Sequence, residues 1–308
     1  ADSYPEKVVN SRATVFDDNT GGESISIFEQ EEAFKRANVK LDLLYWDVCL
    51  MHNMENICQI KDYTRYVMGA AHLTAGVGGN YALLMNLLEN NSNLMDAMKE
   101  YIPAMVKHWV SGEDVDDQKL AKDLAISDMK YVDEVAQNMK QCVSSLIKYR
   151  DGLEPGSAKE LQYYQFNGTA QVGQKGPYPY YSSTYGKLYY FYYNANSVDM
   201  LSAFSRIATA VLDGQMTADV AKLKLSVDKM IPISHCAGTP NFLNRVSLGI
   251  NWIDKKVFEA VHPELPIPTL EGLYSKLRFE QMVGWSRFLK TNNMYRMPTE
   301  NQPSGSVQ

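Results

Sequence analysis

The chain has 308 residues, of which 45% are hydrophobic and 21% are charged. This composition supplies a folded core and excludes a disordered chain or a long coiled coil. With 30 basic and 36 acidic residues the net charge is −6, and the lack of a basic run argues against a nucleic-acid-binding surface. No apolar stretch is long enough to cross a membrane. At about 150 residues per domain, the length predicts two domains.

The first ninety residues predict part of a parallel sheet. A short helix is expected over residues 27–36, and the apolar run at residues 41–47 predicts a buried strand. Residues 54–60 have helical spacing, and residues 66–71 predict a second strand. Strand, helix and strand in about thirty residues form a βαβ unit. Two strands are too few for an independent α/β domain, so further strands are expected from upstream sequence or from another chain.

The rest of the chain predicts mostly helices. Apolar residues recur at three- and four-residue steps over residues 94–109, and again over residues 117–149, where Leu120 and Leu124 fall on the apolar stripe. Residues 161–196 differ in character, because they carry ten tyrosines. The remaining expected elements are helices at residues 197–212, 217–230 and 280–291 and a strand at residues 246–253. We therefore expect an α/β region at residues 1–90, a helical and mixed region at residues 91–300, and a flexible tail at residues 301–308.

Cys49 is the first candidate for a reacting group. It follows the end of the strand predicted at residues 41–47 and precedes the next helix. Reacting groups gather at the carboxyl ends of strands in open α/β sheets, and a nearby helix N-terminus favours a thiolate. The alternative is a small buried apolar residue, because free cysteines are commonly buried. The other cysteines form no C-x-x-C pair with it, so no zinc knuckle is expected.

Asp47 is the second candidate. It ends the apolar strand two residues before Cys49, so its side chain is aimed the same way. A carboxylate against an apolar wall is costly unless it meets a cation. An Arg or Lys of a bound substrate supplies such a cation. A structural salt bridge or a cap on a neighbouring loop is the alternative.

These residues together resemble a known family. Asp47-Val48-Cys49-Leu50-Met51, followed by Glu55, is similar to the signature of the clostripain family of cysteine peptidases. Residues 76–81 resemble that family's Gly-x-Gly-aromatic-Pro-Tyr loop, and weaker similarity returns at residues 247–252 and 274–289. The strong part of the resemblance covers residues 12–81.

The resemblance implies a caspase-like α/β/α sandwich, with part of its sheet in this chain, and a cysteine endopeptidase that cleaves after Arg or Lys. Cys49 would attack the scissile carbonyl, Asp47 would line the pocket for the basic residue, and backbone N–H groups would form the oxyanion hole. No cofactor is required. Calcium, which some members use, is the one optional ion, although Asp17-Asp18-Asn19 does not make an EF-hand pattern.

The family places its general-base histidine upstream of the nucleophile. All five histidines of this chain lie downstream of Cys49, namely His52, His72, His108, His235 and His262. The resemblance therefore implies a His-bearing N-terminal light chain or segment, because precursors of the family are often cut between the two parts. The start at Ala1, without Met or an apolar signal segment, fits a processed heavy chain that is secreted or held in a bacterial envelope.

Two departures support a second hypothesis. His52 stands where the family usually has Gly, and Ala70 where Ser is common. The alternative function is an inactive homologue that acts as a secreted or envelope binding module for a peptide or glycan, with the tyrosines of residues 178–193 as its surface.

His52 is either a base or a surface or capping residue. The pair His235-Cys236 lacks further ligands, so no metal site is expected. Residues 76–79 favour a peptide-contacting loop over a phosphate loop.

Overall fold

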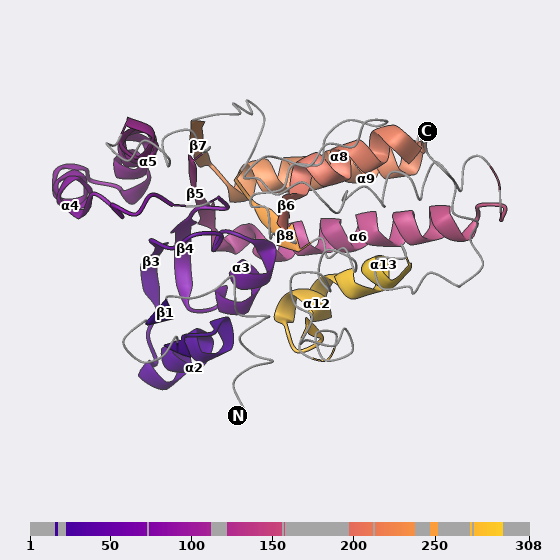
Figure 1. Cartoon of the computed structure of the whole chain (residues 1–308), viewed down its shortest axis with the longest axis horizontal. Coiled ribbons are helices and arrows are strands. Elements are labelled where there is room, and N and C mark those ends of the chain that lie inside the picture. Colours follow the sequence, from indigo (N-terminus) through magenta and orange to yellow (C-terminus); the bar gives the residue numbers. More distant parts are fainter. Residues whose placement is uncertain are drawn as a thin grey trace, which may run out of the picture.

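A computed structural model describes residues 16–17, 23–72, 74–111, 122–155, 157, 197–211, 213–237, 247–251, 272 and 274–291. A four-stranded sheet with the order β3-β4-β5-β7 lies at the centre (Figure 1). Its strands are β3 (Leu41–Trp46), β4 (Thr64–Gly69), β5 (Lys122–Asp128) and β7 (Ile233–Ala237). β3 and β4 are parallel, whereas the β4–β5 and β5–β7 pairs are antiparallel. The sheet is therefore mixed.

The predicted βαβ unit is confirmed as β3, α3 (Met54–Ile60) and β4. The Asn53 side chain caps α3 by accepting the N–H of Asn56. β3 was expected to be fully buried, and this is wrong, because only Trp46 among its residues is buried. The reason is its place in the sheet: no strand within the described ranges pairs with its outer side.

Helices cover both faces of the sheet. Tyr66 and Met68 of β4 and Ile126 of β5 share a core with α4 (Tyr81–Asn90) and α5 (Leu94–Ser111). Val67 and Ala125, which alternate with them, share a core with α3, α6 (Val132–Asp151) and α9 (Gly214–Met230). Successive strand residues point to opposite faces, so these two cores show a three-layer α/β/α arrangement, as expected.

The predicted helix at residues 117–149 is wrong over its first part. Residues 122–128 form β5, all of whose residues are buried, and α6 begins only at Val132. Leu124 and Ile126 face the same side of the sheet, and between them Ala125 faces the other. A short buried run does not distinguish a helix from a strand by spacing alone. Here pairing with β4 and β7 on both sides determines the strand.

β5 and β7 also correct the expectation that all further strands come from outside this chain. The sheet draws strands from both sides of residue 90, the expected domain boundary. The division into regions itself stays a prediction. β7, which contains His235 and Cys236, was not predicted as a strand.

The later elements largely follow the sequence. Residues 197–212 divide into β6 (Ser197–Asp199) and α8 (Met200–Val211), and β8 (Gly249–Asn251) pairs with β6. The helix expected at residues 280–291 is two helices, α12 (Arg278–Val283) and α13 (Trp285–Thr291). Gly284 separates them with a φ of 72°, a left-handed conformation typical of glycine at a helix end.

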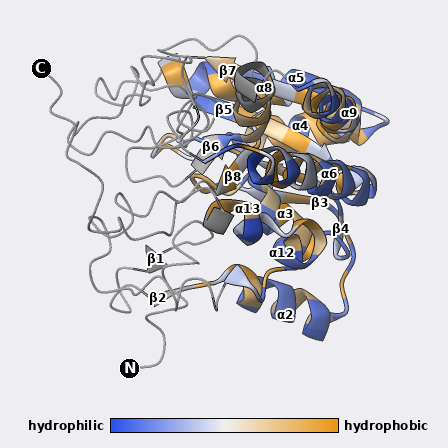
Figure 2. Cartoon of the chain, turned by 90° about the vertical axis from the view of Figure 1, so that its right-hand side faces the viewer, coloured by the Kyte–Doolittle hydropathy of each residue, from blue (hydrophilic) through white to orange (hydrophobic). Residues whose placement is uncertain are grey.

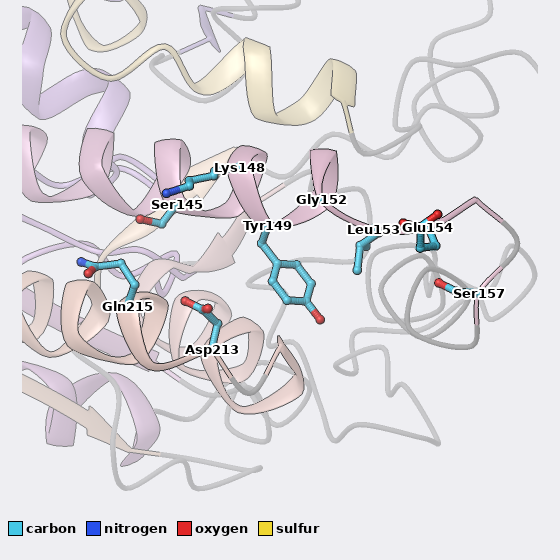
Figure 3. Close-up of a pocket in the computed structure, with 9 residues that line it drawn as sticks. All are labelled: Ser145, Lys148, Tyr149, Gly152, Leu153, Glu154, Ser157, Asp213 and Gln215. Atoms are coloured by element: carbon cyan, nitrogen blue, oxygen red, sulfur yellow. The ribbon is translucent and has the colours of Figure 1, made fainter.

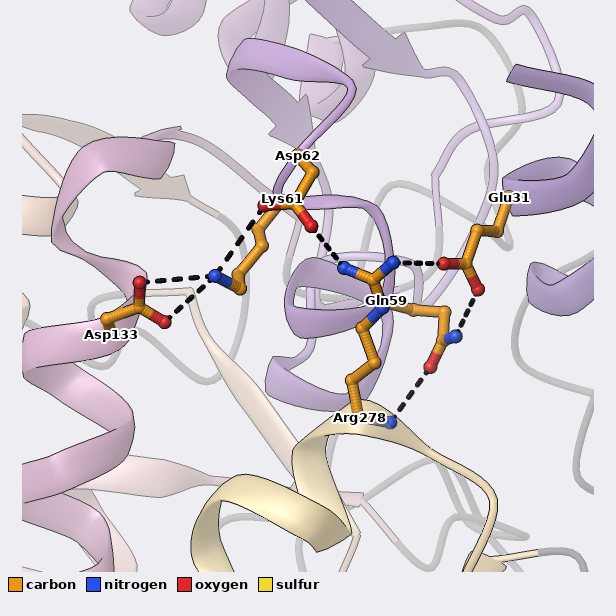
Figure 4. A network of polar contacts seen from close by, with 6 residues as sticks. All are labelled: Glu31, Gln59, Lys61, Asp62, Asp133 and Arg278. Carbon is orange, nitrogen blue, oxygen red and sulfur yellow. Dashed lines mark hydrogen bonds and ion pairs between the residues drawn. The ribbon is translucent and has the colours of Figure 1, made fainter. Parts of the chain in front are cut away.

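A polar network joins the amino-terminal elements to the later helices (Figure 4). Arg278 of α12 pairs with Glu31 of α2 (Ile27–Ala37) and with Asp62, each at 2.5 Å. Lys61 pairs with Asp133 of α6 at 3.0 Å. α12 thus contacts α3, the helix that follows the segment with the candidate residues.

α2 is largely hydrophilic, as Figure 2 shows. A two-residue pair, β1 (Phe16–Asp17) and β2 (Glu23–Ser24), precedes α2. Within the described residues, no helix has the length and apolar character needed to span a membrane. The tyrosine-rich stretch at residues 161–196, the tail at residues 301–308 and Asp18-Asn19 lie outside the described residues.

Candidate active site

Asp47 and Cys49 lie in the turn that connects β3 to α3. Asp47 directly follows the strand, and Leu50 adopts a left-handed conformation with a φ of 62°. The N–H of Leu50 donates to the carbonyl of His72, which follows β4. A non-glycine residue in this region is uncommon and marks a turn held by its surroundings. The turn therefore lies at the carboxyl end of the two parallel strands, as predicted.

The sulfur of Cys49 contacts Thr74. The Thr74 N–H donates to Sγ at 3.3 Å, and the Thr74 hydroxyl lies 3.2 Å from Sγ. Cys49 is half-buried. α3 begins only at Met54, so the donor at the sulfur comes from the segment after β4 and not from a helix N-terminus. This arrangement gives a thiolate at this half-buried residue two hydrogen-bond donors.

Asp47 points into the loop that follows Thr74. Its Oδ2 accepts the N–H of Gly79 at 2.6 Å and the hydroxyl of Tyr81 at 2.7 Å. Its Oδ1 is buried and has no hydrogen-bond partner among the described residues. Carboxylate and thiol therefore contact one segment, residues 74–81.

Two glycines let this loop approach the carboxylate. A Cβ on Gly79 would lie 3.1 Å from the Tyr45 ring and 3.2 Å from Asp47 Oδ2. Gly78 has a φ of 67°, and a Cβ there would lie 3.1 Å from Asp47 Oδ2. One N–H of the loop, that of Gly79, is engaged by Asp47. Peptide contact by this loop stays a prediction.

His52 is neither a base nor a surface residue. Its side chain is fully buried, with Nδ1 2.5 Å from the carbonyl oxygen of Ser247 and Nε2 2.9 Å from the hydroxyl of Ser127. A carbonyl only accepts, so Nδ1 carries the proton and Nε2 accepts from Ser127. Burial lowers the pKa of His52 to about 4, although the hydrogen bond that its Nδ1–H donates to the Ser247 carbonyl acts in the opposite direction. Both ring nitrogens are engaged, so His52 is a neutral core residue.

The other cysteines are poor nucleophiles or lie elsewhere. Burial raises the pKa of the Cys58 thiol far above its ordinary value, and burial raises that of Cys142 to about 12. Cys236 is half-buried in β7, where it pairs with Asp123 across the sheet. Of the four free cysteines, Cys49 is the one in the turn after β3.

Sequence reasoning missed Thr74 and Asp123. Thr74 holds the sulfur, and Asp123 Oδ1 accepts the backbone N–H of His72 at 2.9 Å. The available signal was the position of Thr74 just after a predicted strand, where functional side chains gather. For Asp123 there was no such signal, because its strand was taken for a helix.

Within the described part of the chain, no three His, Cys, Asp or Glu side chains are placed to hold a metal ion.

A cavity of about 460 Å³ lies away from Asp47 and Cys49, between the end of α6 and the start of α9 (Figure 3). Its lining includes Tyr149, Asp213 and Gln215.

Comparison with known proteins shows which family model and which solved structures the chain is similar to. The sequence model of the clostripain family matches residues 2–224, more than half of the chain. No curated protein matches. One similar solved structure is a clostripain from Bacteroides thetaiotaomicron in complex with the peptide inhibitor BTN-VLTK-AOMK. It has 13% identity and a TM-score of 0.54, with 83% of this chain and 93% of that chain covered.

Two further structures have the same fold. A secreted C11 cysteine protease from Bacteroides thetaiotaomicron has 13% identity and a TM-score of 0.55, with 84% of this chain and 60% of that chain covered. An inactive zymogen C11 protease from Parabacteroides distasonis has 14% identity and a TM-score of 0.50, with 83% and 62% covered. This chain thus spans less than two thirds of these two proteins. The fold is the caspase-like α/β fold of the C11 proteases, and by the match of the family model the chain belongs to the clostripain family of cysteine peptidases.

Proposed function

We propose that this chain is the Cys-bearing part of an endopeptidase that cleaves peptide bonds after Lys or Arg, with Cys49 as nucleophile and Asp47 as the partner of the basic side chain. The observation that carries the proposal is the joint position of the two side chains. A half-buried sulfur with two donors and a carboxylate with one unmatched oxygen contact the same segment, residues 74–81. The VLTK inhibitor of the Bacteroides clostripain, whose peptide ends in lysine, supports the basic preference.

In this reaction the Cys49 sulfur attacks the scissile carbonyl carbon and forms a thioester, while its proton passes to a histidine base. The histidine returns the proton to the leaving amine. Water then hydrolyses the thioester, which releases the new carboxyl end and restores the thiol. Backbone N–H groups stabilise the oxyanion in both steps.

The base, in this proposal, comes from a His-bearing segment or light chain. His52 is unsuited because both of its ring nitrogens are engaged. The outer side of β3 pairs with no strand of the described chain, and Cys49 follows directly after β3. A strand added there would end beside the thiol if it ran parallel to β3. The zymogen state of the Parabacteroides protease supports a processed precursor.

Three variants of the assembled protein test the assignment, with kcat/KM measured on matched peptides that carry Lys, Arg or Gln before the cut. Cys49→Ala should abolish hydrolysis, whereas Cys236→Ala should retain it. Asp47→Asn keeps acceptor oxygen for the loop but removes the charge. We expect it to lower kcat/KM for Lys and Arg peptides about tenfold to a hundredfold, because hydrogen bonds to charged groups are worth roughly 1.5–3 kcal/mol. Hydrolysis by Cys49→Ala, or equal cleavage of Gln peptides by the native protein, would refute the proposal.

A location outside the cytoplasm, by secretion or in the cell envelope, is part of the proposal. Its support is the secreted C11 protease of similar fold. The alternative function, an inactive binding module, relied on the tyrosines of residues 178–193, which lie outside the described residues. Hydrolysis that depends on Cys49 would exclude it.

A further inference from the structure

The two oxygens of Asp47 are unequally engaged. Oδ2 accepts two hydrogen bonds, from the Gly79 N–H at 2.6 Å and from the Tyr81 hydroxyl at 2.7 Å. Oδ1 accepts none from the described residues, although it is buried. A carboxylate oxygen has two lone pairs, so Oδ2 is saturated and Oδ1 is the free acceptor. A buried acceptor without a donor costs free energy that an incoming donor relieves.

The hydroxyl of Tyr81, a partly exposed residue, is one of the two donors that engage Oδ2. Tyr81 is the first residue of α4, whose start is capped by the Asn80 side chain, and 54% of the residue is exposed. Its ring lies 6.2 Å from that of Tyr45, which packs edge-on against Tyr101. Burial of its hydroxyl, together with the hydrogen bond to Asp47, raises the pKa of Tyr81 to about 12. The hydroxyl therefore stays protonated at neutral pH and donates to the carboxylate.

Lys and Arg make different demands on such a carboxylate. A guanidinium pairs best in a forked arrangement with one N–H on each oxygen, whereas an ammonium is a compact point charge that one oxygen satisfies. An ammonium at Oδ1 leaves both existing bonds of Oδ2 intact. A forked guanidinium must displace the Tyr81 hydroxyl or lose one of its own two bonds. The Gly79 N–H belongs to the backbone of the loop and is harder to displace.

We propose that Tyr81 is a specificity-determining residue that biases the Asp47 pocket toward Lys over Arg before the cut. The inference rests on the proposed function, because it takes Asp47 as the partner of the basic side chain. It adds the chemical preference within that class and assigns it to one hydroxyl group.

The test compares kcat/KM for two peptides that differ only in Lys or Arg before the cut. The native protein should favour the Lys peptide. Tyr81→Phe keeps the ring against Tyr45 and frees one lone pair of Oδ2, so the Lys-to-Arg ratio should fall about tenfold, the worth of one charge-assisted hydrogen bond. Tyr63→Phe is the matched control, because it removes a tyrosine hydroxyl at the opposite end of β4. The control should leave the ratio unchanged.

A second readout separates this inference from the proposed function. Fluorescence anisotropy with labelled peptides ending in Lys or Arg measures binding to the Cys49→Ala variant and to the Cys49→Ala, Tyr81→Phe double variant, without catalysis. If the native protein cleaves neither peptide, the proposed function fails, and these affinities still decide the inference. A native preference for Arg, or a Lys-to-Arg ratio that Tyr81→Phe leaves unchanged in both assays, would overturn it. A fall of that ratio in Tyr81→Phe alone supports it.

Discussion

Thr74 shows how a single residue outside the recognisable motif can control the nucleophile. Its N–H lies 3.3 Å and its hydroxyl 3.2 Å from the Cys49 sulfur. Donors that face the sulfur stabilise the thiolate form relative to the thiol, and the thiolate is the nucleophile. Thr74 does not contact the scissile bond in this scheme, so it is a positioning residue.

Thr74→Val removes the hydroxyl and keeps the N–H and the branched shape. We expect kcat on a Lys peptide to fall about threefold to tenfold, which corresponds to one hydrogen bond of roughly 0.5–1.5 kcal/mol, with little change in KM. Thr74→Ser should restore most of the activity. The rate of Cys49 alkylation by iodoacetamide at pH 7 should follow the same order. A Thr74→Val protein with native kcat and native alkylation rate would exclude this role.

His52 predicts a pH dependence of stability. Its pKa is about 4 in the folded chain, below the ordinary value of 6.5, because burial disfavours the charged ring. Between these values the unfolded chain binds a proton that the folded chain does not. The free energy of unfolding should therefore fall as the pH drops from about 6.5 to about 4, by up to roughly 1.4 kcal/mol per pH unit. Denaturant titrations at several pH values measure this slope.

The control for this prediction is His108→Gln, which changes an exposed histidine on α5 and should keep the native slope. His52→Gln should be less stable at pH 7, because it disturbs the contacts with Ser127 and Ser247, but its profile should be flatter in this window. A His52→Gln profile parallel to the native one would contradict the assignment.

At the scale of elements, the spacing of apolar residues predicted those helices and strands whose form depends on their own sequence. The unit β3–α3–β4 followed from alternating strand and helix spacing, which also placed Asp47 and Cys49 at a strand end. β5 was missed, because its burial on all sides is a property of its partners β4 and β7. The roles of His52 and Thr74 were missed for the same reason. Their partners lie far away in sequence: Ser247 is 195 positions from His52, and Thr74 is 25 positions from Cys49.

The segment before α3 also depends on a distant element. The N–H of Gly249 in β8 donates to the carbonyl of His52, and Asn53 forms a bridge with Gly249. The weak resemblance at residues 247–252 thus coincides with a strand that supports the turn bearing Cys49. The sequence resemblance included both the segment before α3 and residues 247–252, but their contact is seen only in the structure.

At the scale of the whole molecule, α12 links the late part of the chain to the elements around the site. Arg278 pairs with Glu31 of α2 and with Asp62, and its backbone N–H donates to Gln59 of α3 at 3.0 Å. The side chains of Arg278 and Glu31 are 28% and 18% exposed, so this pair is shielded more than an ordinary surface pair, whereas Asp62 is 57% exposed. Nearby, the Tyr274 hydroxyl donates to Glu55 at 2.9 Å inside the core. These contacts make α12 part of the support of α3.

Arg278→Ala should lower the free energy of unfolding by about 1.5–3 kcal/mol, because it leaves the largely buried Glu31 carboxylate without its cation, whereas the exposed Asp62 keeps Lys61 as a partner at 3.6 Å. Arg36→Ala is the matched control. Arg36 pairs with Glu32 on the exposed surface of α2, one turn away, and such pairs are worth about 0.3–0.5 kcal/mol. Urea titrations at low and high salt compare the two. The loss in Arg278→Ala should persist at high salt, where the Arg36–Glu32 pair is screened. Equal, salt-sensitive losses in both variants would show that the Arg278 network acts as an ordinary surface pair and does not hold α12 against α3.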